Sequence, residues 1–402
     1  MAKLKIGLFF GGRSTEHEVS VISALQAYKS LNKEKYEVVP VYVTKEGQFF
    51  SDPKLLELKN YRDIKGLLLS SVQNIPARIG AHGGLIQQGF FKKMKPLDLA
   101  FPLFHGSFGE DGCIQGLFEI YQIPYVGFNV TGSAIAMDKV QFKAIVKELG
   151  YPVANYTYFS RNAWIKDPKQ ILKQLTREST GLSPVQDDTN GGLKFPMFVK
   201  PATGGSSIGA GKAKNEDELS FAIEVASAYA EKIIVEEAFE GLIEVNCSAL
   251  GYGLEVKTSV CEQPIPTSDI LSFADKYQRG GGKKTGGSGG METLSRIIPA
   301  PISAKLTKEI QRATEDLFKA LDGCGVTRVD FFVDPKKEKF WVNEMNTPPG
   351  SLAFYLWEKS GIKYTELLDL LIGYALKREE DKKKTQYVFN SGLLQEMAKK
   401  SV

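Results

Sequence analysis

The chain has 402 residues, of which 43% are hydrophobic and 24% are charged, and its formal net charge at pH 7 is +4. The length is typical of a protein with two or three domains. The composition is typical of a globular protein and excludes wholesale disorder, a collagen-like fibre and a bundle of membrane helices. The charge is too small and too scattered for a surface that binds nucleic acid or an anionic membrane, so neither is expected as a partner.

The first third of the chain predicts an open α/β sheet. Its expected elements are a buried strand over residues 3–10, a helix over 16–31, and strands over 37–44 and 97–104. This order is that of a βαβ unit, in which the loops at the strand ends hold ligands. Residues 45–96 show no clear period, and we expect a hairpin and surface loops there. The apolar stretch 6–10 is too short for the core of a signal peptide, so we expect a cytoplasmic protein.

A second unit begins near residue 129. Its expected elements are a helix over 131–150, a flexible insertion over 181–194, a strand over 195–200, a helix capped by Asn215 and Glu218, a strand over 233–238, a helix over 303–322, and a hairpin of strands over 325–334 and 339–345. Apolar spacing, capping residues and turn residues support these assignments. The tail after Lys377 carries a run of charges and is expected to be a solvated helix end.

Oxygen-bearing side chains converge on the expected hairpin. Glu344 and Asn346 lie two apart on one strand and share a face that meets Asp330 on the other strand. Mg²⁺ prefers such oxygen ligands, and four cysteines without a Cys-x-x-Cys pair argue against zinc. The alternative is that the two acids are ordinary hairpin charges, paired with Arg328 or Lys339.

A lysine stands at the start of a glycine- and serine-rich stretch. Lys200 ends a predicted strand, and residues 201–209 form a flexible tip whose backbone N–H groups can fold over phosphate oxygens. The stretch is not a Walker A motif, because Lys212 is followed by Ala213 and the first glycine is missing. A plain hairpin turn without a ligand is the alternative from these residues alone.

Several short motifs stand in a fixed order along the chain. They are Gly-Gly-Arg-Ser-Thr-Glu-His-Glu-Val-Ser at 11–20, His-Gly-Ser-Phe-Gly-Glu-Asp-Gly at 105–112, Met-Asp-Lys at 137–139, Val-Lys-Pro at 199–201, Gly-Ser-Ser-Ile-Gly at 205–209, Arg-Val-Asp at 328–330 and Asn-Glu-Met-Asn-Thr-Pro-Pro-Gly at 343–350. Together they resemble the D-alanine:D-alanine ligase family of ATP-grasp enzymes, from about residue 5 to about residue 375. Seven motifs in register are a specific signal.

The resemblance implies an α/β protein of the ATP-grasp fold, with an N-terminal Rossmann-like α/β domain followed by two α+β domains that clasp ATP. The implied bounds are 1–128 for the N-terminal domain, 129–235 for the central subdomain, 236–385 for the C-terminal subdomain with a lid loop over 272–291, and 386–402 for the tail. The family usually forms homodimers through its N-terminal domain, so a homodimer is expected.

The resemblance also implies which residues bind the nucleotide and the metal. The nucleotide set falls on Lys139, Lys200, Ser206, Ser207, Glu236, Glu237, Phe239, Glu244 and Lys276. The two early lysines match phosphate contacts, Glu236 matches the acceptor of the adenine amino group, and Glu244 matches the ribose carboxylate, with one extra residue before it. Asp330, Glu344 and Asn346 match the ligands of two Mg²⁺ ions, with Mn²⁺ as an alternative.

The substrate residues follow in the same way. The catalytic set falls on Glu16, His105, Ser206, Tyr277, Arg328 and Gly350, and the substrate contacts fall on Glu16, His105, Tyr277, Arg328, Gly350 and Tyr355. Glu16 holds the ammonium of the first substrate, Arg328 and the N–H of Gly350 face the oxyanion, and Lys276 and Tyr277 begin the lid. The implied reaction joins two D-alanines to D-alanyl-D-alanine through a D-alanyl phosphate, for synthesis of the peptidoglycan precursor and the cell wall.

Some points stay open at this stage. Tyr355 stands where the family has a serine that binds the second substrate's carboxylate, so a D-lactate or D-serine acceptor is an alternative, although Tyr277 favours D-alanine over D-lactate. A different ATP-grasp carboxylate:amine ligase would lack Glu16, His105 and the pair Lys276–Tyr277. A non-catalytic nucleotide-binding module would lack Arg328 or an acidic metal ligand. The glycine-rich stretch 280–290 is either a plain linker or carries Lys283 and Lys284 to the triphosphate.

Overall fold

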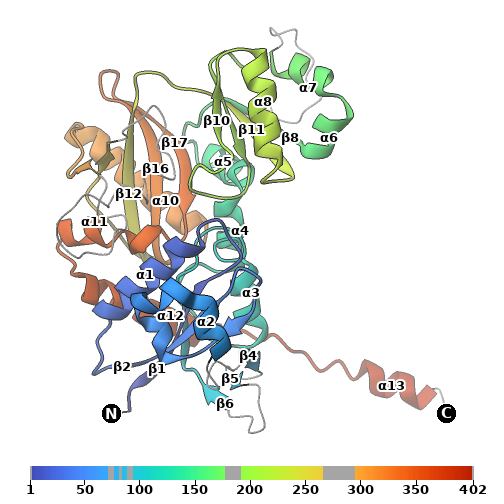
Figure 1. Ribbon diagram of the computed structural model, residues 1–402, viewed down its shortest axis with the longest axis vertical. Helices are drawn as coiled ribbons and strands as arrows, with labels where there is room; N and C mark the ends of the chain where they lie inside the picture. The colour runs from blue at the N-terminus through green and yellow to red at the C-terminus, as the bar shows by residue number, and fades with distance from the viewer. Residues whose placement is uncertain are drawn as a thin grey trace.

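The computed structural model describes residues 2–70, 77–80, 84–87, 94–176, 192–265 and 295–400. The predicted lid with Lys276 and Tyr277 lies outside these ranges, as do Lys283, Lys284 and most of the predicted insertion over 181–194. Three four-stranded sheets make up the body. Figure 1 shows the N-terminal unit in blue at the base, with the green central sheet and the yellow-to-orange C-terminal sheet side by side above it.

The N-terminal sheet has the order β3-β2-β1-β7 and contains the predicted βαβ unit. Its strands are β1 (Leu4–Gly11), β2 (Tyr36–Val43), β3 (Phe49–Phe50) and β7 (Leu99–Pro102), and α1 (His17–Ser30) connects the first two. β1 runs parallel to both β2 and β7, which explains why it is apolar along most of its length: a strand covered on both faces has no polar side.

The stretch between β2 and β7 is made of short elements. They are the 3₁₀ helices η1 (Pro53–Leu56) and η2 (Leu58–Asp63), the helix α2 (Ile64–Ser70), and strands β4 (Ala77–Gly80), β5 (Gly84–Gln87) and β6 (Met94–Pro96). β4 and β5 pair antiparallel, so the predicted hairpin is confirmed. The helix α3 (Cys113–Ile120) follows β7 and the polar loop that begins at His105.

The central sheet has the order β10-β9-β11-β8 and is entirely antiparallel. Its strands are β8 (Tyr156–Ser160), β9 (Met197–Pro201), β10 (Gly211–Ala213) and β11 (Lys232–Glu237), with helices α6 (Arg161–Lys166), α7 (Pro168–Leu175) and α8 (Glu216–Ser227). The predicted glycine–serine tip joins β9 to β10. Asn215 caps α8 as predicted, accepting from the N–H of Glu218 at 2.9 Å, but Glu218 returns its bond to the N–H of Lys214 at 2.8 Å rather than to that of Asn215.

The C-terminal sheet has the order β13-β12-β16-β17 and contains the predicted hairpin. Its strands are β12 (Ile243–Tyr252), β13 (Glu255–Thr258), β16 (Cys324–Asp334) and β17 (Lys339–Asn346), and α10 (Ala304–Ala320) packs its buried stripe against them. A separate pair of two-residue strands, β14 (Gln263–Pro264) and β15 (Arg296–Ile297), brings residues 265 and 295 together, with the N–H of Ile265 bonded to the carbonyl of Ser295 at 2.9 Å.

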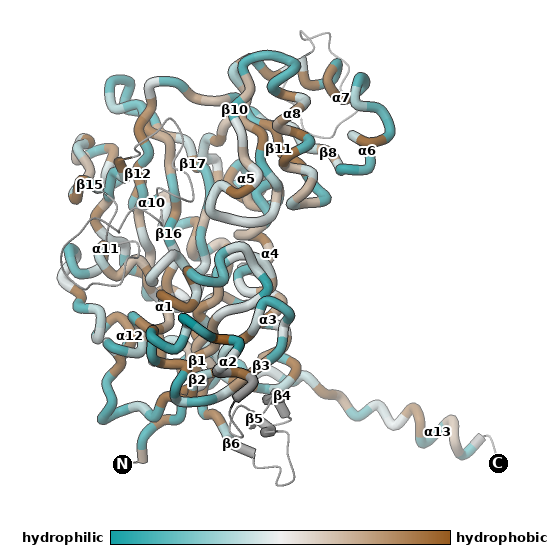
Figure 2. Tube along the Cα trace, viewed as in Figure 1, coloured by the Kyte–Doolittle hydropathy of each residue, from teal (hydrophilic) through white to brown (hydrophobic). Residues whose placement is uncertain are grey.

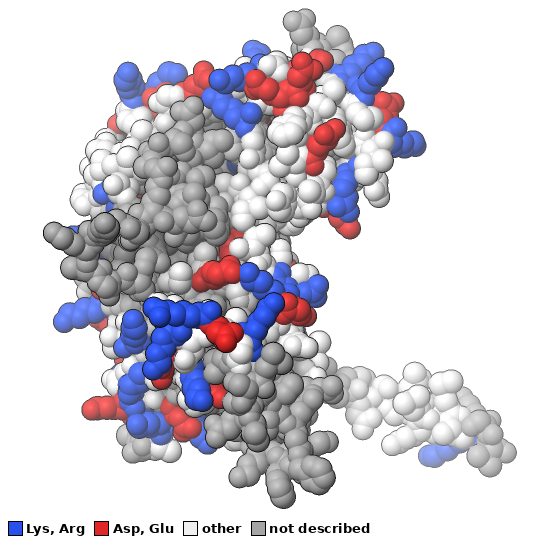
Figure 3. Space-filling view, viewed as in Figure 1, with Lys and Arg blue, Asp and Glu red and all other residues white. Residues whose placement is uncertain are grey.

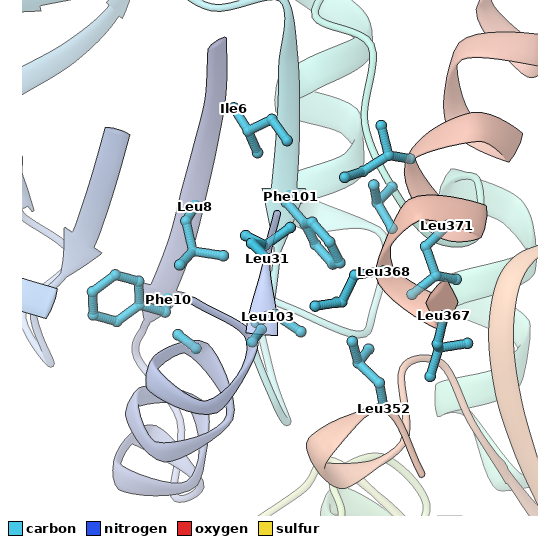
Figure 4. Close-up of a cluster of buried hydrophobic side chains, with 14 of the residues drawn as sticks. Ile6, Leu8, Phe10, Leu31, Phe101, Leu103, Leu352, Leu367, Leu368 and Leu371 are labelled. Atoms are coloured by element: carbon cyan, nitrogen blue, oxygen red, sulfur yellow. The ribbon is translucent and has the colours of Figure 1, made fainter. Parts of the chain in front are cut away.

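One hydrophobic core joins the two ends of the chain. Helices α11 (Phe354–Lys359) and α12 (Tyr364–Lys382) return to the N-terminal unit after the C-terminal sheet. Figure 4 shows Leu367, Leu368 and Leu371 of α12 facing Ile6, Leu8 and Phe101 of the N-terminal sheet, and all of them are fully buried. The central sheet has its own cluster instead, which is built with α7 and α8.

The charged end of α12 differs from the expectation of a solvated helix end. The Arg378 guanidinium is buried, donates to the carbonyls of Tyr125 and Gly127, and stacks over the Tyr125 ring, while Lys382 pairs with Glu119. Arg378 faces the N-terminal unit because α12 lies against it, and a charge pattern read along one helix does not reveal that contact. The prediction is therefore wrong for these two residues.

The surface carries no large field of one sign on the side that Figure 3 displays, where basic and acidic side chains alternate. None of the helices within the described ranges combines the length and apolar character needed to cross a bilayer. A tail with α13 (Leu393–Lys400) leaves the body (Figure 1), and hydrophobic residues recur along it (Figure 2). Tyr387, Val388 and Phe389 are 73–82% exposed there.

The helix expected over residues 131–150 is two helices. α4 (Val130–Met137) and α5 (Lys139–Glu148) meet at Asp138, whose backbone is extended with φ −87° and ψ 103°. The Asp138 carboxylate accepts from the N–H groups of Val140 and Gln141 at 3.0 and 3.2 Å and pairs with Lys232 Nζ at 2.5 Å. The apolar spacing continues from α4 into α5, because both helices have buried residues. The sequence pattern therefore does not reveal the break at Asp138.

Asp138→Ala is expected to lower the free energy of unfolding by about 1 kcal/mol, because it removes the cap of α5. Urea denaturation followed by circular dichroism measures this change. Asp138→Asn keeps the oxygen that caps α5 and loses only the ion pair with Lys232, so it should lower the free energy of unfolding less than Asp138→Ala does. An unchanged urea midpoint in the alanine variant would show that the cap does not stabilise α5.

Candidate active site

A cleft between the central and C-terminal sheets gathers most of the predicted nucleotide and metal residues. Its walls include Lys139, Lys200, Ser207, Glu236, Glu237, Phe239, Glu244, Arg328, Asp330 and Glu344. A smaller adjoining pocket shares Lys139, Gly204, Gly205 and Glu344 with the cleft and adds Asn346. Lys139 and Glu344, which are 205 positions apart in the sequence, therefore line the same cleft.

A buried ion triad stands at the inner wall of the cleft. Glu236 on β11 lies 3.0 Å from Lys143 Nζ through Oε1 and 2.7 Å from Lys200 Nζ through Oε2. Burial alone would raise the pKa of Glu236, but the two lysines outweigh it and lower the pKa to about 2. The carboxylate is thus held charged, which suits an acceptor for an amino group.

Lys143 was not singled out from the sequence. It is 1% exposed through its side chain, and burial lowers its pKa although Glu236 acts in the opposite direction. It stands four residues after Lys139 on α5, so the two lysines share one face of the helix. This spacing of four residues is the sequence signal that could have identified Lys143, because it puts both side chains on the side of α5 that faces the cleft wall.

The two predicted phosphate lysines differ in their partners. Lys139 Nζ donates to the carbonyl of Gly204 at 2.7 Å and so holds the glycine–serine tip, while Lys200 Nζ also reaches Asn343 Oδ1 at 3.1 Å. Burial lowers the pKa of Lys139, whereas the carboxylates of Glu236 and Glu344 overcome burial and raise the pKa of Lys200. Lys200 therefore carries the more firmly held positive charge.

The tip itself has a tightly turned backbone. Ser206 and Ser207 both have φ +57°, a left-handed conformation that L residues rarely adopt, after Gly204 at φ +102°. A turn of this kind directs successive N–H groups to the same side, where they can receive an anion. Ser207 lines the cleft, and Gly205 approaches Glu16 so closely that an added Cβ would stand 2.9 Å from its Oε1.

The predicted metal residues lie side by side. Asp330 on β16 is directly opposite Glu344 on β17, and Asn346 Nδ2 donates to Asp330 Oδ2 at 3.2 Å. Arg328 Nε and Nη2 donate to the two oxygens of Asp330 at 2.6 and 2.7 Å, so the ion pair that we considered as the alternative is formed.

Two carboxylates and an amide oxygen at one cleft edge match the donor chemistry of Mg²⁺. Among the described residues no group of three His, Cys, Asp or Glu side chains could hold a metal, so a site here depends on Asn346 as the third ligand.

The predicted substrate residues of the N-terminal unit flank the cleft. Glu16 is 3% exposed and precedes α1, and an added Cβ on Gly106 would stand 2.3 Å from its Oε2, so only glycine fits there. His105 Nε2 lies 3.0 Å from Ser23 Oγ, and His105 Nδ1 lies 3.8 Å from Glu110 Oε1. Burial raises the pKa of Glu110, against the opposing effect of His105. Glu110 belongs to the quoted 105–112 motif but was given no role from the sequence.

The loop after β17 carries the remaining predicted residues. Gly350 opens the turn η5 (Gly350–Ala353), in which Ser351 bonds to Gln26 and Ser23 of α1, so the turn is tied to the N-terminal unit. Tyr355 lies on α11, directly after this turn, and its hydroxyl donates to Glu262 Oε1 at 2.9 Å. Glu262 was not anticipated from the sequence.

Comparisons with known proteins agree with this architecture. Residues 5–128 match the family model described as the D-ala D-ala ligase N-terminus, and residues 145–373 match that of the D-ala D-ala ligase C-terminus. Among curated relatives, the D-alanine–D-alanine ligase of Bacillus cytotoxicus is 37% identical over 391 residues, covering 96% of this chain and 99% of the relative. That of Natranaerobius thermophilus is 37% identical over 395 residues, covering 97% and 100%.

Solved structures show the same similarity. The D-alanine-D-alanine ligase of Coxiella burnetii has a TM-score of 0.75 at 28% identity, covering 96% of this chain and 97% of its own. A D-Ala:D-Ser ligase of Enterococcus faecalis has a TM-score of 0.74 at 29% identity, covering 93% and 100%. The fold expected from the sequence motifs is confirmed, and the chain belongs to the D-alanine–D-alanine ligase family and has its ATP-grasp fold.

Proposed function

We propose that this protein joins two molecules of D-alanine to D-alanyl-D-alanine with conversion of ATP to ADP and phosphate. The observation that carries this proposal is the single cleft in which phosphate-type lysines, oxygen ligands and Arg328 meet, in a chain of this family. A carboxylate is a poor electrophile, so one D-alanine is first activated as D-alanyl phosphate and the amine of the second then attacks its acyl carbon. Phosphate leaves and the dipeptide remains.

The chain's own residues have distinct parts in this scheme. Glu236, with the backbone of Glu237 and Phe239, accepts and frames the adenine, Glu244 takes the ribose, and Lys139, Lys200 and the Ser206–Ser207 tip hold the phosphates. Support comes from the cleft that all of these residues except Ser206 line, and from the charged state of Glu236. Glu16 holds the first ammonium, His105 lies near it, and Arg328 with the N–H of Gly350 stabilises the oxyanion. Lys276 and Tyr277 belong to the same proposal.

Asp330, Glu344 and Asn346 would hold two Mg²⁺ ions, or Mn²⁺ in their place. Their oxygens are of the hard type that these cations select. Asp330 and Glu344 line the cleft together with Lys139, and Asn346 lines the adjoining pocket with Lys139. When bound, the ions neutralise charge on the transferring phosphoryl group. Arg328 donates to both oxygens of Asp330, so the guanidinium and a bound ion would compete for the same two carboxylate oxygens.

We propose that this enzyme serves peptidoglycan precursor synthesis in the cytoplasm and acts as a homodimer paired through the N-terminal unit. Membership of the ligase family supports this proposal, and light scattering of the purified protein tests the dimer.

A D-serine acceptor is the second candidate, because one of the similar solved structures is a D-Ala:D-Ser ligase. D-Lactate is a third. The choice depends on the pocket around Tyr355, where the expected serine of the family is absent.

Release of phosphate with ATP, Mg²⁺ and D-alanine tests the function, with L-alanine as the control. We expect phosphate only with the D isomer and a product with the mass of D-alanyl-D-alanine. Mixed reactions with D-serine or D-lactate then rank the acceptors, and we expect D-alanine to be preferred at neutral pH. Phosphate release that does not depend on D-alanine would contradict the proposal.

A further inference from the structure

Three polar side chains form a linked group on the cleft wall beside Arg328. Glu262 and Arg296 line the cleft, and Arg296 Nη1 lies 3.3 Å from Glu262 Oε2. The Arg296 guanidinium carbon lies 3.7 Å from the centre of the Tyr355 ring. The Tyr355 hydroxyl donates to Glu262 Oε1, so the three side chains close a ring of contacts. We call this group the Arg296 cluster.

The cluster is brought together by the fold rather than by sequence proximity. Glu262 precedes β14, Arg296 begins β15, and these strands pair with Pro264 opposite Arg296. Asn246 on β12 exchanges backbone bonds of 2.9 Å with Glu262 and donates from its side chain at 3.1 Å. Glu262 is 2% exposed, so its orientation is fixed by burial and by bonds from three sides.

The cluster lies at the end of the cleft away from the nucleotide base. Phe332 on β16 contacts Phe239 with ring centres 5.5 Å apart, and Phe239 is the residue proposed beside the adenine. Asp330 and Arg328 follow on the cleft side of the same strand, which places Arg328 about 13 Å from Phe332 at the usual rise of a strand. Glu262 and Tyr355 are close enough to Arg328 there that each helps to raise the pKa of its guanidinium.

The reaction needs a cation at this position. The attacking amine of the second substrate must approach the acyl carbon beside Arg328, and in an amino acid only one carbon separates the amine from the carboxylate. The carboxylate of the acceptor therefore ends up next to Arg328 and requires a positive partner of its own. A planar guanidinium matches a carboxylate with two parallel hydrogen bonds, which a phenol cannot do.

We propose that Arg296, stacked on Tyr355 and oriented by Glu262, binds the carboxylate of the acceptor amino acid and so determines which acceptors are used. This inference rests on the proposed function and deepens it. Tyr355 then contributes its ring as the support of the guanidinium, since its single O–H already donates to Glu262. An acceptor with a free carboxylate is favoured over one in which the carboxylate is capped.

D-Alaninamide isolates the acceptor position. It has no carboxylate to activate, so with D-alanine, ATP and Mg²⁺ it serves only as the attacking amine. Product masses from reactions with both amines give the ratio of kcat/KM for D-alanine to that for D-alaninamide as acceptor. We expect Arg296→Met to reduce this ratio by about 10- to 100-fold, the range for loss of a charged hydrogen bond.

Three further variants separate this role from a structural one. Arg296→Lys keeps the charge and should recover part of the ratio. Tyr355→Phe keeps the ring under the guanidinium and should change the ratio less than Arg296→Met does. Lys212→Met removes another cation from the same cleft, one that pairs with Glu240 at 3.1 Å, and should leave the ratio unchanged.

The outcomes distinguish the two proposals. A folded Arg296→Met protein with the wild-type ratio overturns the role of Arg296, and so does a ratio that falls with Tyr355→Phe but not with Arg296→Met. A higher KM for ATP with an unchanged ratio places Arg296 at the nucleotide and also overturns it. If the wild-type protein releases no phosphate with D-alanine, the proposed function itself fails.

Discussion

Replacing Arg328 with methionine is expected to lower kcat by about 100- to 1000-fold, the usual cost of removing one oxyanion donor. The guanidinium is 6% exposed and faces the cleft, where charge develops on the acyl oxygen during attack by the amine. Steady-state phosphate release at saturating ATP and D-alanine measures the effect. KM for ATP should change little, because Glu236, Phe239 and Glu244, which we propose for the adenine and the ribose, lie outside β16.

Two further variants serve as controls for this prediction. Arg312→Met removes an arginine whose side chain is 82% exposed on α10, and it should leave kcat unchanged. Arg328→Lys retains the charge beside Asp330 and separates loss of catalysis from loss of folding, since removing one partner of a buried pair also destabilises the protein. A folded Arg328→Met protein with kcat within a few-fold of wild type would remove Arg328 from the oxyanion site.

Glu236→Gln is expected to lower the free energy of unfolding by about 3 to 5 kcal/mol, because it leaves Lys143 and Lys200 buried without their carboxylate. Thermal and urea denaturation measure the loss. Glu237→Gln is the matched control: it is the next residue on β11, is less buried, and bonds to Asn155 at 2.9 Å. The control should cost well under 1 kcal/mol, in the range of exposed polar contacts.

The same substitution has a defined pH dependence. The pKa of Glu236 is about 2 in the folded protein and near 4.5 when unfolded, so its charge stabilises the fold above pH 4.5 and stops doing so as pH falls toward 2. The stability difference between wild type and Glu236→Gln should therefore be full at neutral pH and shrink below pH 4.5. A constant difference down to pH 3 would contradict the assigned ion triad.

The sequence predicted those parts of the fold that depend on local pattern. The apolar run of β1, the amphipathic stripe of α10 and the turn at Asp334 each have a signal within a few residues, and the structure confirms them. The break at Asp138 was missed because capping by a single carboxylate interrupts a helix without interrupting its apolar pattern. Burial of Arg378 was missed because it depends on which unit α12 covers.

In the candidate site too, residues that are close in the sequence could be predicted to meet, and residues that are far apart could not. Asp330, Glu344 and Asn346 could be placed together because a hairpin fixes their register over a short span. Glu262 and Tyr355 are 93 positions apart and meet only when β14 has docked beside β12, so no local pattern brings them together. Whether Asp330 pairs with Arg328 or faces a ligand depends on side-chain geometry that the strand pattern leaves undetermined.

The hydrophobic cluster shared by the N-terminal sheet and α12 limits how the molecule can open for substrates. Separating these two units would expose Ile6, Leu8, Leu367 and Leu371 to water at about 2 kcal/mol for each side chain, which is too costly for a step in every turnover. Among the described residues, the buried cluster that the central sheet forms with α7 and α8 is separate from this core, so a movement of that sheet would leave the core intact. Lys200 on β9, which we propose as a phosphate contact, would travel with the central sheet in such a movement.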